Sequence, residues 1–216
     1  MNDIISLKQV ERKIFSIATH DGLTDIFLGC IFMMFAIAPF LSADLGDFWS
    51  SAIFVPFWAV IALAIWLIRR YVIKPRIGEV KFGAARKAKL RRFHIVMIIA
   101  NAIALILGLW FSFSTEESSG SIMTIRFGLI CLAISSLAAY FLDYRRLYVY
   151  GLLAGLSPLI GEWLWAHGYA SHHGFPITFG ITASVMILTG LFVFLRLLRA
   201  YPILKEENIL EEVQDE

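Results

Sequence analysis

The chain has 216 residues, of which 59% are hydrophobic and 17% are charged, and its formal net charge is +2. Soluble domains carry about 25% charged and about 45–50% apolar residues. The composition therefore excludes a soluble enzyme, a nucleic-acid-binding domain and a disordered protein. It predicts an all-α, multi-pass membrane protein.

Residues 1–20 are predicted to form an amphipathic helix that lies on the membrane surface. Apolar side chains recur here at spacings of three and four, on one helical face, and the basic side chains lie off that face. A helix of this kind rests in the interface plane. The alternative is a helical extension of the first span, but the sequence His20–Gly22 interrupts the pattern and favours the interfacial helix.

Six apolar stretches follow, each long enough to cross about 30 Å of hydrocarbon. They are continuous and lack the alternation typical of membrane β-barrels, so they are predicted to be helices. The pieces between them are too short to fold as a separate soluble domain. The prediction is a six-helix transmembrane domain over 21–200 and an acidic tail over 201–216, with spans at 25–41, 51–68, 93–113, 122–142, 147–166 and 176–195.

The connections between the spans alternate in charge. Every Lys and Arg except Arg126 falls in residues 1–24, 69–92 or 143–146, or after the last span. The other connections carry acids or histidines and no Lys or Arg. The positive-inside rule makes the basic side cytoplasmic. Both termini are then cytoplasmic, and the protein is expected in the cell membrane, the inner membrane of a bacterium.

The connection after the second span holds most of the basic residues. Topology determination explains such charge, and recognition of anionic lipid, at about 1 kcal/mol per basic residue near the surface, is the alternative. The acidic tail could also dock on this connection, in the same chain or a neighbouring one, or remain solvated. The candidate lipid or partner residues are Lys74, Arg76, Lys81, Arg86, Lys87, Lys89, Arg91 and Arg92.

Two ionisable residues stand out inside the predicted spans, Arg126 and Glu162. Such groups are costly in a membrane and usually face the protein interior. Each lies one turn inside the outer end of its span, and the two spans form a hairpin, so we predict that the side chains meet at similar depth. The pair would either lock two helices or line an outward-facing cavity or ion path. Snorkelling of Arg126 to the surface is a third possibility.

Two further intramembrane residues are unusual. Asn101, near the middle of the third predicted span, is expected to hydrogen-bond a neighbouring helix. Pro158 is predicted to kink or break the fifth span, beside Gly151 and Gly155, which allow close helix packing. A broken helix next to Glu162 would match the binding sites of transporters, whereas a packing kink is the plainer explanation.

Histidines gather after the fifth span, at His167, His172 and His173, downstream of Glu162. Imidazole and carboxylate groups suit Zn²⁺. The spacing matches no zinc motif, and Glu162 and His167 do not share a helical face. The three histidines are therefore weak metal candidates, and no cofactor is expected.

Two segments carry a resemblance to other proteins: His20–Ile26, before the first span, and Lys74–Phe82, after the second. They resemble a group of small, uncharacterised prokaryotic membrane proteins. The resemblance implies a bacterial or archaeal membrane protein and carries no activity or site residues across. Both segments lie at cytoplasmic helix ends, which predicts that Asp21 or Asp25 pairs with Arg76.

None of the motifs of soluble enzymes is present in the sequence. An intramembrane enzyme would need converging acids, and only Asp21, Asp25 and Asp143 are available on the cytoplasmic side. We therefore expect a small transporter or channel-like protein, in oligomeric form, with a polar site in the outer leaflet. The alternative is a non-catalytic membrane subunit or scaffold that holds a partner protein or anionic lipid at its basic face.

Overall fold

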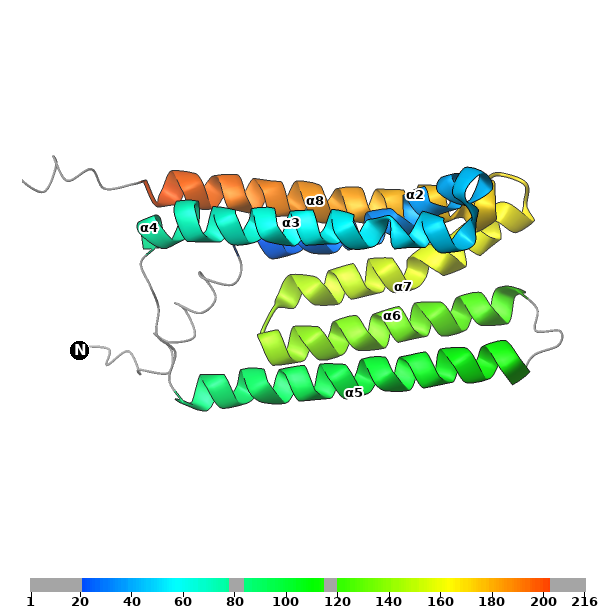
Figure 1. Ribbon diagram of the computed structural model, residues 1–216, viewed down its shortest axis with the longest axis horizontal. Helices are drawn as coiled ribbons and strands as arrows, with labels where there is room; N and C mark the ends of the chain where they lie inside the picture. The colour runs from blue at the N-terminus through cyan, green and yellow to red at the C-terminus, as the bar shows by residue number, and fades with distance from the viewer. Residues whose placement is uncertain (1–20, 78–83, 115–119, 203–216) are drawn as a thin grey trace, which may run out of the picture.

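A computed structural model describes residues 21–77, 84–114 and 120–202 of the protein, and these ranges contain helices and no strand. The predicted all-α class is confirmed. The surface helix predicted over 1–20 lies outside the described residues, as does the tail from residue 203. The elements are α2 (Leu23–Ala52), α3 (Phe54–Ile68), the π-helical η1 (Arg69–Ile73), α4 (Lys74–Ile77), α5 (Ala84–Ser114), α6 (Gly120–Leu142), α7 (Arg145–Ala166), the 3₁₀ turn η2 (His172–Gly174) and α8 (Phe175–Ala200) (Figure 1).

Five segments of the described chain are long and apolar enough to cross a membrane. They coincide with five of the six predicted spans. The remaining one, 93–113, lies within the continuous helix α5, so a sixth crossing stays a prediction. The five segments are Leu23–Ser42, Phe48–Arg76, Ile122–Leu142, Arg145–Ala166 and His172–Ala200.

The second span runs further than its sequence indicates. Helical structure continues from α3 through η1 into α4 and reaches Ile77. Pro75 does not end this helical stretch. It directly follows the π-helical turn η1, where the regular i→i−4 hydrogen-bond pattern is already interrupted.

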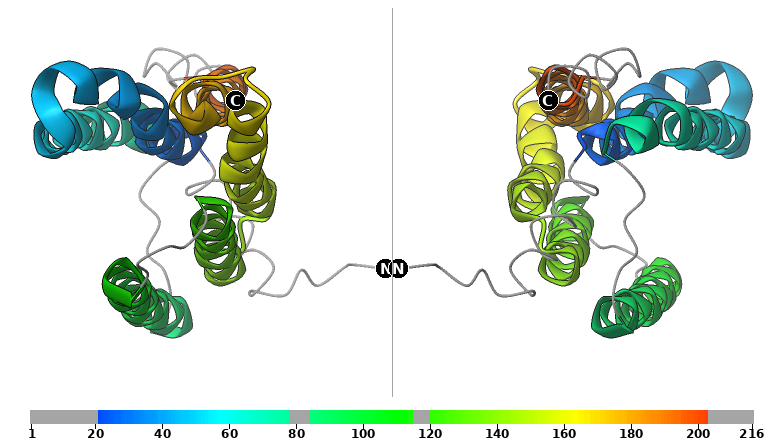
Figure 2. Two further views of the ribbon diagram at one scale, coloured as in Figure 1. Left: turned by 90° about the vertical axis from the view of Figure 1, so that its right-hand side faces the viewer. Right: turned by 90° about the vertical axis from the view of Figure 1, so that its left-hand side faces the viewer.

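The helices pack as a curved row rather than a closed bundle. Its order is α3, α2, α8, α7, α6 and α5, and the most extensive contacts join α2 to α8 and α6 to α7 (Figure 2). Because neighbours run in opposite directions, the starts of α2, α5 and α7 lie at the same end as the finishes of α4, α6 and α8 (Figure 1). We call this the Asp21 end and the opposite one the Glu162 end.

Glycines set the distance between α6 and α7. A Cβ atom added to Gly128 would lie 2.4 Å from the carbonyl oxygen of Gly155, so neither position has room for a side chain. The small-residue face predicted at Gly151 and Gly155 is confirmed, because Gly151 likewise meets the side chain of Ser135 on α6.

Pro158 does not break α7. The helix runs from Arg145 to Ala166 with this proline inside it, so the predicted break is wrong, whereas the packing kink, the plainer explanation, stays a prediction. Pro158 is buried against α6. The next residue towards the N-terminus, Ser157, donates to the Leu153 carbonyl at 2.8 Å and contacts the Thr182 hydroxyl of α8 at 2.8 Å. Tight packing on both sides holds the helix together despite one lost backbone hydrogen bond.

Candidate functional site

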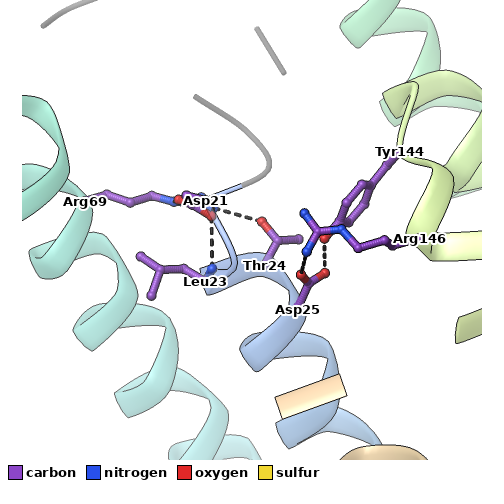
Figure 3. Close-up of polar contacts among 7 residues, drawn as sticks. All are labelled: Asp21, Leu23, Thr24, Asp25, Arg69, Tyr144 and Arg146. Carbon is purple, nitrogen blue, oxygen red and sulfur yellow. Dashed lines mark hydrogen bonds and ion pairs between the residues drawn. The ribbon is translucent and has the colours of Figure 1, made fainter. Parts of the chain in front are cut away.

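A buried carboxylate begins α2 at the Asp21 end. The side chain of Asp21 is fully buried and caps α2 by accepting the Leu23 N–H at 3.0 Å. It also accepts two hydrogen bonds from Arg69, from Nε at 2.7 Å and from Nη2 at 3.1 Å. Nη2 donates in addition to the Thr24 hydroxyl at 2.8 Å. This bidentate pair ties the start of α2 to η1 (Figure 3).

A second buried carboxylate lies on the first turn of the same helix. Asp25 is fully buried, its Oδ2 lies 2.6 Å from Nη1 of Arg146, and its Oδ1 accepts a hydrogen bond from the Tyr144 hydroxyl (Figure 3). The Arg146 guanidinium also lies over the Tyr144 ring, 5.1 Å from its centroid. This cluster ties α2 to the start of α7.

Tyr150 completes the surroundings of Asp25. It is buried one turn further along α7, close to Asp25, Arg146 and Thr189. Its hydroxyl lies within reach of these three side chains without a well-formed hydrogen bond to any of them among the described residues. Tyr150 therefore adds a buried polar group beside the Asp25 carboxylate.

Two glycines allow the start of α2, where both aspartates lie, to pack closely on α8. Gly22 has φ 83°, which favours glycine, and a Cβ atom there would lie 2.2 Å from the carbonyl oxygen of Gly190. A Cβ atom on Gly190 would in turn lie 2.8 Å from the Cβ of Asp25. The start of α2 thus sits directly against α8, which excludes water from the carboxylates.

The prediction that Asp21 or Asp25 pairs with Arg76 is wrong. Asp21 pairs with Arg69 and Asp25 pairs with Arg146, on opposite sides of α2 (Figure 3). Asp21 precedes the first helical residue, so the helical rule that residues four apart share a face does not apply. Nε and Nη1 of Arg76 are buried, without a hydrogen-bond partner among the described residues.

A carboxylate and an imidazole meet at the Glu162 end. Oε2 of Glu162 lies 3.0 Å from Nδ1 of His173, and the two side chains are 14% and 52% exposed. His172 and His173 both have left-handed backbone angles, φ 51° and 54°, which are unusual for residues other than glycine. Such strain is characteristic of functional sites.

Close backbone contact fixes the position of this pair. Gly174 follows His173, and a Cβ atom on it would lie 2.4 Å from the carbonyl oxygen of Gly161, the residue before Glu162. The turn η2 is therefore pressed against α7, which holds the backbone of His173 beside Glu162.

The pair borders a cavity of about 400 Å³. The cavity is partly open rather than fully enclosed, and the half-exposed side chain of His173 is one of its lining residues. The lining side chains come from α2, α6, α7, η2 and α8, and most are aromatic or aliphatic. The described lining residues are Phe35, Met123, Thr124, Phe127, Glu162, His173 and Phe175.

The other intramembrane candidates have separate environments. Arg126 is partly buried on α6, and its pairing with Glu162 stays a prediction. Asn101 is exposed and donates from Nδ2 to the Met97 carbonyl at 2.8 Å, within α5, so the expected bond to another helix is not made among the described residues. The cause is the position of α5 at the edge of the row, where a helix asparagine bonds back to its own backbone.

The three histidines do not converge. His167 contacts the Trp163 carbonyl at 2.9 Å, and His172 packs on Phe40 with a centroid distance of 5.4 Å. Within the described ranges, no group of three or more His, Cys, Asp or Glu side chains is arranged to hold a metal ion.

The basic residues lie at the Asp21 end. Lys74, Arg91 and Arg92 are exposed there. Lys81 lies outside the described residues, as do the side chains of Arg86, Lys87 and Lys89. Lipid or partner binding at this surface stays a prediction.

The chain matches no protein-family model, no curated protein and no solved structure. The features that bear on function are the polar clusters at the Asp21 end and at the Glu162 end. Sequence reasoning identified Asp21, Asp25 and Glu162, but it did not identify Arg69 and Arg146 as their partners or the aromatic cavity.

Proposed function

We propose that this protein is a small transporter whose solute-binding site is the cavity beside Glu162. The observation that carries the proposal is the contrast between the two ends of the same helices. The Glu162 end holds a partly open cavity, whereas ion pairs fasten α2 to its neighbours at the Asp21 end.

The orientation in the membrane follows from charge. The described Lys and Arg side chains other than Arg126 belong to helix ends and turns at the Asp21 end. The positive-inside rule makes this end cytoplasmic, with six spans and both chain termini inside the cell. The cavity then opens from the outer leaflet or the outer surface.

Transport requires that the closed end can open. Alternating access moves one group of helices against another around a central site. Here α2 belongs to both clusters, because Phe35 lines the cavity and Asp21 and Asp25 make the ion pairs. Release of these pairs would free the cytoplasmic end of α2, so the arrangement corresponds to an outward-open, inward-closed state.

Uptake into proteoliposomes tests the proposal. A panel of K⁺, organic cations, organic anions and neutral amino acids would be compared with protein-free liposomes. We expect one solute class to enter faster with the protein, and Glu162→Gln to reduce that uptake. Asp44→Asn, at an exposed acid on α2, is the matched control and should leave it unchanged.

Two results would overturn the proposal. The first is uptake of no class above the protein-free rate. The second is the absence of uptake together with a stoichiometric partner that co-purifies from native membranes. This result would favour the alternative, a non-catalytic membrane subunit or scaffold. The exposed apolar face of α5, which includes Ile95, Ile98 and Ile99, is the surface such a partner would cover.

A further inference from the structure

We propose that the cavity binds hydrophobic organic cations, such as quaternary ammonium or phosphonium compounds with aromatic substituents. The inference rests on the proposed function for its role in transport. Binding itself can be measured separately.

The size of the cavity suits a small organic molecule. Its volume is about 400 Å³. Ligand pockets of roughly 300–1,000 Å³ enclose drug-sized compounds and have mostly apolar walls with a few convergent polar groups. A single inorganic ion would leave most of this apolar space unfilled.

Packing on a buried phenylalanine holds the aromatic lining of the cavity in place. Phe179 is fully buried, and the rings of Phe35 and Phe175 pack on it with centroid distances of 5.1 and 5.5 Å. Phe127 packs on Phe35 at 5.6 Å. The three lining rings are only partly buried, so each retains surface for the cavity. Aromatic faces attract cations, most strongly where water is excluded.

The charge of the cavity selects the sign of the ligand. Glu162 supplies a mostly buried carboxylate, and the described lining residues include no Lys or Arg. Among the described residues, His173 donates one hydrogen bond to Oε2 of this carboxylate. A lipid tail would need no carboxylate, and an organic anion would be repelled by it. A cation with apolar substituents satisfies both the carboxylate and the rings.

Binding to the purified full-length protein tests the inference. The probes are tetraphenylphosphonium, neutral triphenylphosphine oxide and anionic tetraphenylborate, measured by equilibrium dialysis with protein-free micelles as background. We expect saturable binding of the cation, weaker binding of the neutral compound and none of the anion.

Variants assign the binding to the cavity. Glu162→Gln removes the charge at constant size and should weaken cation binding by about tenfold or more. Phe127→Leu should weaken it by roughly three- to tenfold. Asp44→Asn and Phe192→Leu, at an exposed acid and an exposed phenylalanine away from the cavity lining, should leave it unchanged.

Equal binding of the neutral compound, unaffected by Glu162→Gln, would overturn the inference and leave an apolar cavity for lipid. Preference for the anion, lost in Arg126→Gln, would also overturn it. Cation binding without uptake would contradict the proposed transport and retain the site. Uptake of another solute class without cation binding would support the proposed transport and contradict the cation site.

Discussion

Asp25 is the residue on which the Asp21 end depends most. Its carboxylate is fully buried, and its partners are Tyr144, directly before α7, and Arg146, in the first turn of α7. A buried ion pair is weak evidence for net stability, because desolvation opposes the attraction. Removing one partner is different, since it leaves an uncompensated charge in the protein.

Arg146→Ala should therefore destabilise the detergent-solubilised protein by about 3–5 kcal/mol. Arg145→Ala changes an exposed neighbour and should have little effect. Thermal unfolding followed by near-UV circular dichroism measures both. If the double variant Asp25→Asn/Arg146→Met recovers much of the loss, the cost arises from the unpaired charge. If Arg146→Ala and Arg145→Ala unfold at the same temperature, the proposed role of the Asp25–Arg146 ion pair in stability is contradicted.

Asp21 offers a second matched comparison at this scale. Arg69 makes the bidentate contact, whereas its neighbour Arg70 lies over the rings of Trp66 and Tyr71. Arg69→Lys keeps the charge but cannot reproduce the planar fork. We expect it to lower the unfolding temperature, and Arg70→Lys to change it much less. The reverse order would show that the bidentate pair contributes nothing.

At the scale of elements, small residues determine how closely the helices approach. Gly128 and Gly155 place α6 against α7, and Gly22 and Gly190 place α2 against α8. Without a hydrophobic driving force between helices in lipid, such close packing is a main source of association. The two glycine contacts thus set the spacing of two pairs of helices that line the cavity, α6 with α7 and α2 with α8.

Gly128→Ala should separate α6 from α7, because the new methyl group would lie 2.4 Å from a backbone oxygen. We expect a loss of about 1–3 kcal/mol, the usual cost of overpacking. Gly180→Ala is the control: its methyl group would meet only the Ala36 side chain, at 3.8 Å. It should be neutral or stabilising by about 0.5–1 kcal/mol. Proteolysis rates in detergent report both effects.

At the scale of the whole molecule, α3 and α5 stand at the two edges of the row, and among the described helices each packs mainly on one neighbour. Their exposed apolar side chains, such as Val60 and Leu63 on α3, suit contact with lipid or with a second copy of the chain. A row of this kind is consistent with a multi-pass protein, and its direction in the membrane depends on charge.

Cysteine accessibility tests that direction. In a variant lacking Cys30 and Cys131, a membrane-impermeant maleimide should label Tyr169→Cys and Gly120→Cys in intact cells. It should label Arg91→Cys and Tyr201→Cys only after the membrane is opened. Gly120 is the decisive position, because without a crossing by α5 it would lie on the same side as Arg91.

The sequence by itself determined the helical class, five of the spans and the clustering of basic residues. It could do so because long apolar stretches in a membrane must satisfy their backbone hydrogen bonds internally, whatever their neighbours are. It also marked Glu162, since acids are rare in apolar segments, and Asp21 and Asp25, which belong to a segment at a predicted cytoplasmic helix end.

Only the tertiary structure decided which groups these acids meet. Arg69 and Arg146 are 48 and 121 residues away from Asp21 and Asp25 along the chain, and helical periodicity carries no information about such contacts. The Glu162–His173 pair requires a left-handed turn pressed on a glycine, and the cavity requires five elements to meet. Packing between helices sets both, because side-chain partners depend on helix order and distance, which local sequence does not specify.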